Sequence, residues 1–317
     1  MKKKLIIFSF FLTLCVSIIF SVKMWLSMDF IDISTNGLIA ITIFIIVSLL
    51  LGCFLMALAF FSSRFGFDDQ VDHDLESIIE KHKKFSSNLK SYSIGGVLLL
   101  SFFIYYFIFI SVDFLILIIL LLIFIIGLFS DTGKMNSVSL RFFLQVILIA
   151  IFIHLMNIEI VSTKVNFFDN LLENNIVNIL FSTFCLTVLI NGTNFMDGLN
   201  GLVIKYFLII YLIINFVLQN FVFDQQFVNY IILALSIILL FNLLGYLYLG
   251  DSGSYLLSLF TGIFLINFSN NNPTISPYFI IVLLWYPCFE LLFSMIRRFF
   301  KKTKTYEPDT KHLHQLI

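Results

Sequence analysis

Several polar clusters interrupt a chain that is otherwise strongly apolar, and one of them is dense enough to suggest a binding site. It reads NGTNFMDGLNGL over residues 191–202 and combines a carboxylate, three amides and glycine: Asp197, Asn191, Asn194, Asn200 and Gly198. Carboxylate and amide oxygens bind divalent cations, and glycine lets the backbone approach a ligand closely. A capped turn between two helices uses the same residue types, so both interpretations stay open at this point.

Two further clusters each hold a single acid. The first, GDSGS over residues 250–254, places Asp251 just before an apolar stretch. Exposed backbone N–H groups at a helix start suit an anion, and the carboxylate suits a divalent cation. The second closes an apolar run with Gly127 and Asp131 and is followed by Arg141 and Gln145. An ordinary helix cap accounts for either acid taken alone.

Two more patterns suggest phosphate chemistry. In the C-terminal tail, His312 and His314 lie near a basic run and are suited to contacting phosphates, although a solvated tail explains such a pair equally well. A DDxxD cluster formed by Asp68, Asp69 and Asp72 has the spacing with which isoprenoid enzymes bind a diphosphate through magnesium. The later loops offer single acids instead of a second such cluster, which favours a solvated acidic loop.

Composition places these clusters in a membrane protein. The 317 residues are 60% hydrophobic and 12% charged, with a mean hydropathy of +1.03, which is too apolar for a soluble domain. A net charge of zero gives no argument for a basic surface that binds nucleic acid. The sequence contains no CxxC pair, so neither a zinc site nor a disulfide framework is indicated. We predict an all-α polytopic transmembrane bundle of about ten helices, with spans near 5–22, 38–61, 95–112, 114–129, 141–160, 176–193, 201–221, 226–249, 254–268 and 278–299.

The distribution of basic residues predicts the orientation of this bundle. With the N-terminus inside, all of the 19 Lys and Arg residues except Lys23 and Lys164 fall on the inner side. The polar clusters described above then lie on that cytoplasmic face. We expect a single integral membrane domain over 1–317, with a retained, signal-anchor-like helix at 5–22, a cytoplasmic loop at 62–94 and a cytoplasmic tail at 300–317.

Taken in chain order, these motifs resemble the polyprenyl-phosphate N-acetylhexosamine-1-phosphate transferase family, that is, glycosyltransferase family 4, related to phospho-N-acetylmuramoyl-pentapeptide transferase. The resemblance runs from about residue 80 to the C-terminus. The two most specific matches are the family's NxxNxxDGxxGL motif at 191–202 and its GDxGS turn at 250–254. Weaker matches, which gain weight from their order, are Gly127 with Asp131, Glu290 with Arg297 and Arg298, and His312 with His314.

The chain departs from the family pattern at several positions. Ser130 stands where the family usually has the first Asp of a pair, and Asn200 where many members have a second Asp near the uracil base. Gln315 replaces the last His of the tail motif. Family members usually continue into one more helix after the position of Ile317. These departures bear on nucleotide preference and on activity.

The resemblance implies a reaction and a set of site residues. A sugar-1-phosphate, of N-acetylhexosamine type, moves from a UDP-sugar to undecaprenyl phosphate, with Mg²⁺, or alternatively Mn²⁺, as cofactor. The implied location is the bacterial inner membrane, where the reaction starts a cell-surface polysaccharide such as O-antigen, and members commonly form homodimers. Asp131 and Asp197 are the implied catalytic residues, and Asp251 and Asp197 the metal ligands. The implied substrate-binding residues are Asn191, Asn194, Asn200, Gly198, Arg297, Arg298, His312 and His314.

Three alternatives belong to other functional classes. A catalytically impaired family member acting as a binding partner is consistent with Ser130 and Gln315. A polytopic transporter would place its acids near the membrane midplane, whereas here they lie at helix ends. A membrane prenyltransferase would use the acidic cluster Asp68, Asp69 and Asp72.

Overall fold

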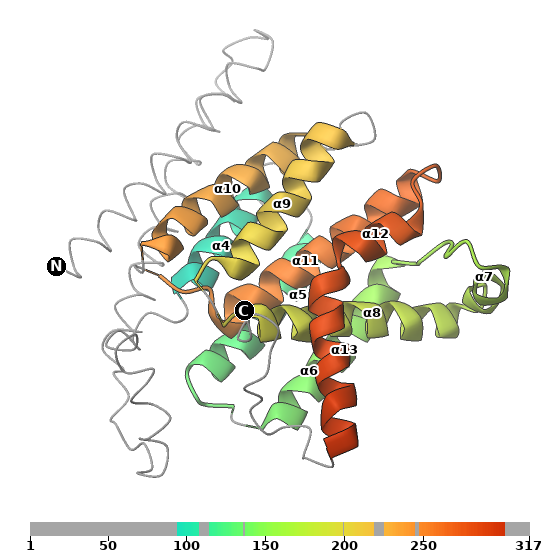
Figure 1. Cartoon of the computed structure of the whole chain (residues 1–317), viewed down its shortest axis with the longest axis horizontal. Helices are drawn as coiled ribbons and strands as arrows, with labels where there is room; N and C mark the ends of the chain where they lie inside the picture. The colour runs from blue at the N-terminus through green and yellow to red at the C-terminus, as the bar shows by residue number, and fades with distance from the viewer. Residues whose placement is uncertain are drawn as a thin grey trace, which may run out of the picture. The chain divides into compact units, whose positions relative to one another are not determined.

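A computed structural model of the chain describes residues 94–107, 114–135, 137–198, 200–218, 225–244 and 247–301 (Figure 1). The chain divides after Lys90, and every described residue belongs to the second unit, Ser91–Ile317. The predicted spans 5–22 and 38–61, the acidic cluster Asp68, Asp69 and Asp72, and the tail with His312 and His314 lie outside the described residues. That the chain forms a single membrane domain therefore stays a prediction.

The described residues form helices and no strand. The helices are α4 (Ile94–Tyr106), α5 (Phe114–Asp131), α6 (Val138–Met156), α7 (Asn166–Leu172), α8 (Asn175–Met196), α9 (Leu202–Val217), α10 (Gln225–Leu243), α11 (Gly250–Asn271), α12 (Pro277–Leu283) and α13 (Trp285–Lys301). Among them α5, α6, α8, α10 and α11 are long and apolar enough to cross a membrane, whereas α4 and α9 are shorter apolar helices. The prediction of an all-α polytopic membrane bundle is confirmed.

The last predicted span differs from expectation because it is broken. The expected helix 278–299 is a pair, α12 and α13, bent by 71° around Leu284. Pro287 explains the restart, since it has no backbone N–H and its ring fits only the first turn of a helix. Tyr206 on α9 donates a hydrogen bond to the Leu283 carbonyl, which helps to satisfy the backbone left open by the break.

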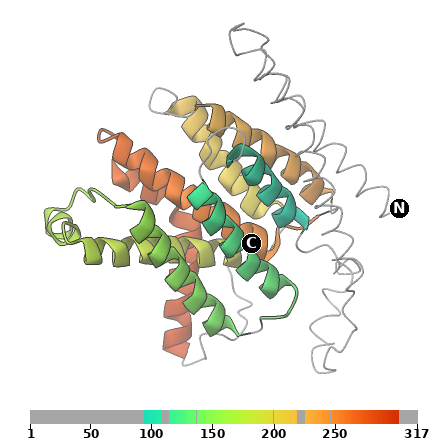
Figure 2. The same ribbon diagram turned by 180° about the vertical axis from the view of Figure 1, so that it is seen from behind.

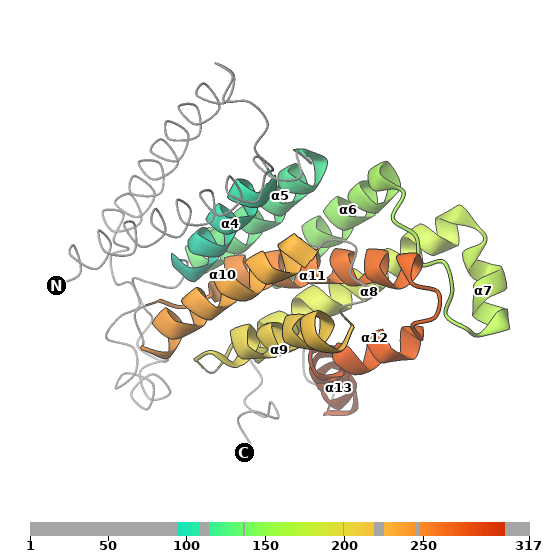
Figure 3. The same cartoon turned by 90° about the horizontal axis from the view of Figure 1, so that it is seen from above.

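The centre of this unit is α11, and most of it is buried. It packs chiefly against α5, α8 and α4 (Figure 3), and α4, α5 and α6 occupy the side of the bundle seen in Figure 2. Glycines make the approach of α5 close: a Cβ on Gly127 would lie 2.4 Å from the Cα of Ser252. The first turn of α11 is thereby held against the last turn of α5.

Helix direction decides which ends meet. The C-terminal ends of α5 and α8 and the N-terminal ends of α6 and α11 come together at one surface of the bundle, as the hydrogen bonds of the site show. The loop between α6 and α8, which contains α7, and the C-terminal end of α11 lie at the opposite ends of the same helices. The polar clusters and the α7 segment are thus on opposite faces of the bundle.

Candidate active site at the first turn of the central helix

The N-terminus of α11 is capped by a residue from another helix. Its own N-cap position is Leu249, which has no polar side chain to offer, and Gly250 enters the helix with a left-handed φ of 71°. Asp131, the last residue of α5, supplies the cap instead. Its Oδ1 accepts from the Asp251 N–H at 2.8 Å, and its Oδ2 accepts from the Ser252 N–H at 3.1 Å and the Ser252 Oγ at 2.7 Å. A carboxylate at this position stabilises unpaired N–H groups and the positive end of the helix.

Asp251 lies beside this cap and is held by a second group from α6. Arg141 places Nη1 2.9 Å from Asp251 Oδ2, and the Ser130 hydroxyl donates to the same carboxylate oxygen. Arg141 also donates to Ser130, so the three side chains close a ring of contacts. The Arg141 and Asp251 side chains are only 18% and 26% exposed, so their ion pair is more sheltered than an ordinary surface pair.

The third carboxylate, Asp197, follows directly after α8. The Gly250 N–H donates to it, which brings the end of the 191–202 motif against the start of the 250–254 motif. Burial, then the negative charge of Asp251 and that of Asp131, raises the pKa of the Asp197 carboxyl to about 7. Three acids from three helix ends therefore share one small volume, and among the described residues Arg141 is the cation paired with them.

The predicted amides divide between two roles. Asn194 accepts from the Ser254 hydroxyl at 3.3 Å and also donates to the Asp251 side chain, so it belongs to the carboxylate cluster. Asn191 is one turn deeper, where its Nδ2 donates to Gln145 Oε1 at 3.0 Å and to the Thr187 carbonyl at 2.9 Å. Asn191 thus links α8 to α6 and does not face the acids directly.

The remaining predicted site residues are placed only in part. Gly198 and Asn200 are exposed in the turn between α8 and α9, next to Asp197 in sequence. Arg297 and Arg298 belong to α13, and the structure describes their backbone but not their side chains. Their predicted roles, like those of His312 and His314, stay predictions.

Arg141 and Gln145 on α6 belong to the site although they were not predicted as site residues. Their place in the sequence, just after a helix cap, is recognisable. Ser137 caps α6 by accepting from the Leu140 N–H, which puts Arg141 in the first turns of that helix and Gln145 one turn later on the same face. Gln145 is fully buried, and its Oε1 accepts from Asn191 Nδ2. Buried donors Arg141 Nε and Gln145 Nε2 have no hydrogen-bond partner within the described part of the chain.

The oxygen atoms of this cluster are of the type that could contribute to a divalent-cation site. Among the described residues no three His, Cys, Asp or Glu side chains are arranged to hold a metal by themselves. Mg²⁺ usually binds through one or two carboxylates together with water and substrate phosphates. Asp251 and Asp197 could supply that partial protein contribution, although Arg141, Ser130 and Asn194 already contact the Asp251 carboxylate.

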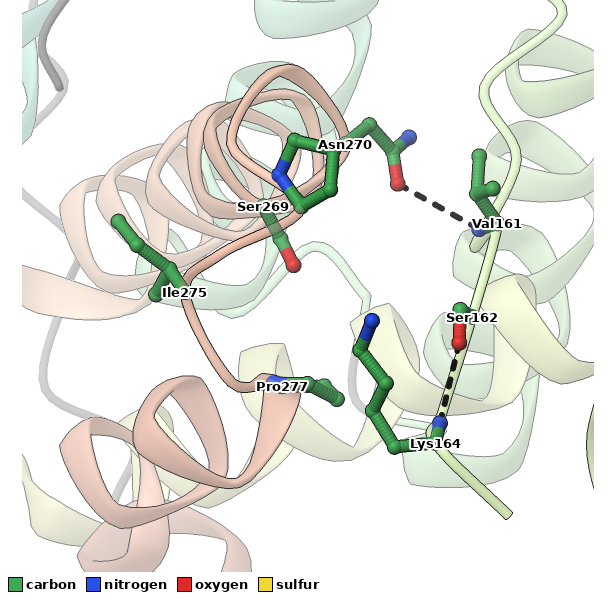
Figure 4. Close-up of a pocket in the computed structure, with 8 residues that line it drawn as sticks. Val161, Ser162, Lys164, Ser269, Asn270, Ile275 and Pro277 are labelled. Carbon is green, nitrogen blue, oxygen red and sulfur yellow. Dashed lines mark hydrogen bonds between the residues drawn. The ribbon is translucent and has the colours of Figure 1, made fainter.

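A small hollow lies at the other end of α11 and is separate from the acids. It is lined by Val161, Ser162, Lys164, Ser269, Asn270, Pro273, Ile275 and Pro277 (Figure 4). None of these residues was predicted as part of a site. The chemistry inferred from the sequence therefore belongs to the first turn of α11 and not to this hollow.

A helical membrane protein with three carboxylates gathered at one surface is the class that this fold and site define. Residues 113–269 match the sequence model of a protein family, Glycosyl transferase family 4. The matched stretch contains Asp131, Asp197 and Asp251. The chain belongs to this family, and it is a membrane transferase of phosphosugars. A search of curated proteins finds no match to the chain.

Proposed function

We propose that this protein transfers a sugar-1-phosphate, of N-acetylhexosamine type, from a UDP-sugar to undecaprenyl phosphate and releases UMP. The observation that carries the proposal is the meeting of Asp131, Asp197 and Asp251 at the first turn of α11, with Arg141 as their counter-charge. Both substrates are anions. A site that brings them together needs positive charge beyond one arginine, and a cluster of acids is suited to recruiting it as a divalent cation.

The chain's own residues divide the work around that cation. Asp251 and Asp197 would hold Mg²⁺, or alternatively Mn²⁺, which when bound neutralises the phosphates that react. Asn194 orients Asp251, and Arg141 fixes one of its oxygens. An oxygen of the acceptor phosphate attacks the phosphorus that carries the sugar. The bond from that phosphorus to the oxygen of the uridine phosphate breaks, and UMP leaves with that oxygen.

Asp131 is better suited to positioning than to proton transfer. Three hydrogen bonds from α11 already occupy its two oxygens. A phosphate monoester has its second pKa near ~6, so the acceptor is mostly dianionic at neutral pH and needs little help from a base. Asp131 therefore acts by holding the first turn of α11, which carries Asp251, in place.

Phosphate oxygens would also satisfy the donors that α6 leaves unpaired. Arg141 Nε and Gln145 Nε2 are buried beside the acids and lack partners among the described residues. Buried N–H groups without acceptors are costly, and a bound phosphate supplies acceptors with negative charge. Small adjustments of these side chains would bring the donors to a substrate.

The location of the site agrees with the substrates. Nucleotide sugars are cytosolic, and the acceptor phosphate lies at the inner headgroup layer, so the carboxylate surface would face the cytoplasm of a bacterial inner membrane. Asn200 and Gly198 in the exposed turn would contact the nucleotide, and Arg297, Arg298, His312 and His314 the diphosphate. The product would start a cell-surface polysaccharide such as O-antigen.

The direct test is turnover by the purified full-length chain. Undecaprenyl phosphate, Mg²⁺ and a panel of UDP-sugars are supplied, and UMP release is measured with and without the lipid acceptor. We expect lipid-dependent release with at least one N-acetylhexosamine donor and none after chelation. Absence of release with every sugar, from protein that melts cooperatively, would refute the proposal.

A further inference from the structure

The segment between α6 and α8 must lie at a membrane surface. Both flanking helices are long and apolar enough to cross a membrane, and α6 ends at Met156 while α8 begins at Asn175. Residues 157–174 therefore connect two spans at the face opposite the carboxylates. In the middle of this connection lies α7, a helix of 7 residues at the end of α8 (Figure 1).

Polar contacts fold this connection onto itself and tie it to α8. Asp169 on α7 accepts from the Thr163 N–H at 2.6 Å and from the Ser162 hydroxyl at 2.9 Å. These hydrogen bonds lower the pKa of the Asp169 carboxyl, which stays charged. Asn178 on α8 donates to the carbonyls of Ile160 and Leu172, so both ends of the segment are tied down.

Apolar side chains are exposed along the other side. Phe167 is 68% exposed and Phe168 49% exposed, and their rings pack edge to face with centroids 5.5 Å apart. Leu171, one turn after Phe167, extends the same face of α7, and Ile176 at the start of α8 is also exposed. Exposing two neighbouring phenylalanine rings to water is unfavourable, and the hydrogen bonds of this segment hold them in that position.

The charge along this connection is mostly negative. Lys164, whose backbone has a left-handed φ of 61°, points its side chain into the hollow that Ser269 and Asn270 also line (Figure 4). The acids Glu159, Asp169 and Glu173 outnumber this one lysine along the connection. Attraction to anionic headgroups therefore does not explain the exposed surface, whereas burial of apolar area does.

We propose that residues 161–176 form an interfacial lipid anchor in the leaflet opposite the carboxylates. Phe167, Phe168 and Leu171 enter the boundary between headgroups and acyl chains, and the polar side with Asp169 faces the bundle and water. Aromatic residues favour this layer of a bilayer. The anchor does not depend on the transferase reaction proposed above.

A second copy of the chain is a poorer occupant of this surface. A seven-residue helix is about 10 Å long, whereas a stable interface usually buries about 800 Å² on each partner. A segment that joins two spans, by contrast, lies next to lipid without any further partner. The bilayer therefore covers the phenylalanines without requiring a larger complementary surface.

Site-specific fluorescence in nanodiscs tests the proposal. The full-length chain, with its four cysteines replaced by alanine, receives Phe167→Cys, Phe168→Cys or the control Asn166→Cys and is labelled with bimane. Asn166 is exposed and lies on the α7 face of Asp169. We expect phospholipid bearing a doxyl group at carbon 5 to quench positions 167 and 168 at least about twofold more than 166, because the anchored face lies roughly 5–10 Å into the boundary. Iodide should show the reverse order.

Each other outcome counts against the anchor. Strong iodide quenching at 167 would place the phenylalanines in water, and resistance to both quenchers would show that protein, such as a second copy, covers them. Replacing part of the phosphatidylcholine by phosphatidylglycerol should leave the pattern unchanged, and a strong dependence on it would overturn burial of apolar area as the driving force. If Phe167→Cys lowers the melting temperature below that of its parent, Leu171→Cys reports on the same face.

Discussion

Arg141 on α6 and Asp251 on α11 form an ion pair at the junction of two motifs that are 110 residues apart, with Nη1 2.9 Å from Oδ2. The pair orients the carboxylate that the family resemblance assigns to the metal. It also offsets one of three negative charges that would otherwise repel one another. A chain with this pair has a partly neutralised site before any cation arrives.

Replacing Arg141 by glutamine should destabilise the protein and abolish turnover. Asp251 would keep its burial beside Asp131 and Asp197 but lose its counter-charge, which we expect to cost about 1–3 kcal/mol of unfolding free energy. Arg141→Lys retains the charge and should recover much of the stability but little activity, since one ammonium cannot reproduce the fork geometry. Thermal melting and UMP release, measured on both variants, separate the two effects. Full activity in Arg141→Gln would contradict a role in the site.

Replacing Ser130 by aspartate should increase the response to divalent cations. The variant removes the hydroxyl that donates to Asp251 and adds a carboxylate that competes for Arg141. Without cation the melting temperature should fall because of added repulsion, and with Mn²⁺ or Mg²⁺ it should rise more than in the parent. Thr132→Asp adds the same charge two residues away, outside this ring of contacts, and is the matched control. Equal responses in both variants would show that general charge alone is responsible.

Asp131→Asn should destabilise the protein, whereas Asp197→Asn should not. Asparagine at 131 places an N–H₂ group where the carboxylate accepts from α11, so loss of this cap should cost about 1 kcal/mol. Asparagine at 197 removes a charge that its neighbours disfavour, so the cation-free protein should melt at the same or a higher temperature near pH 8. Both should lose turnover. An unchanged melting temperature in Asp131→Asn would argue against its capping role.

The raised pKa of Asp197 predicts a specific pH dependence. Because this pKa is about 7 in the folded protein and near ~3.9 in an unfolded chain, the folded state binds the extra proton between these values. Its contribution to stability is therefore complete below pH ~4 and is lost as the pH rises through about 7. Without cation the melting temperature should fall from about pH 5 to about pH 8, and Mg²⁺ should restore it most at the higher pH. Asp197→Asn should flatten this profile, and a parent profile that rises instead would refute the assignment.

The sequence predicts which helix ends carry the acids but not how those ends touch. Asp131, Asp197 and Asp251 could be expected on one face because each follows or precedes an apolar run of membrane length. The contact of Arg141 with Asp251 depends on how α6 packs sideways against α8 and α5, which the hydropathy of the separate apolar runs does not indicate. Close approach at Gly127 is likewise a property of two helices together.

Two features of the fold have only local signals in the sequence. The break at Leu284 follows from one proline inside a span whose hydropathy is otherwise continuous. The seven-residue α7 is shorter than any window used to find a membrane helix, and the hydrogen bonds of Asp169 hold it. The break at Leu284 and the helix α7 were not predicted for the same reason. The average hydropathy of a span hardly changes when one backbone N–H is lost or one carboxylate is added.

The central helix is long and apolar enough to join two membrane surfaces. Its first turn bears the acids, and near its last turn Asn270 donates to the Glu159 carbonyl and accepts from the Val161 N–H of the opposite segment. Twenty-two residues of helix measure about 33 Å, close to the roughly 30 Å of a typical hydrocarbon core. The length of α11 therefore fixes the distance between the carboxylates and the α7 segment. A thicker or thinner bilayer would shift the carboxylates relative to the headgroup phosphates, so acyl chain length itself becomes a variable that sets how well this enzyme meets its lipid acceptor.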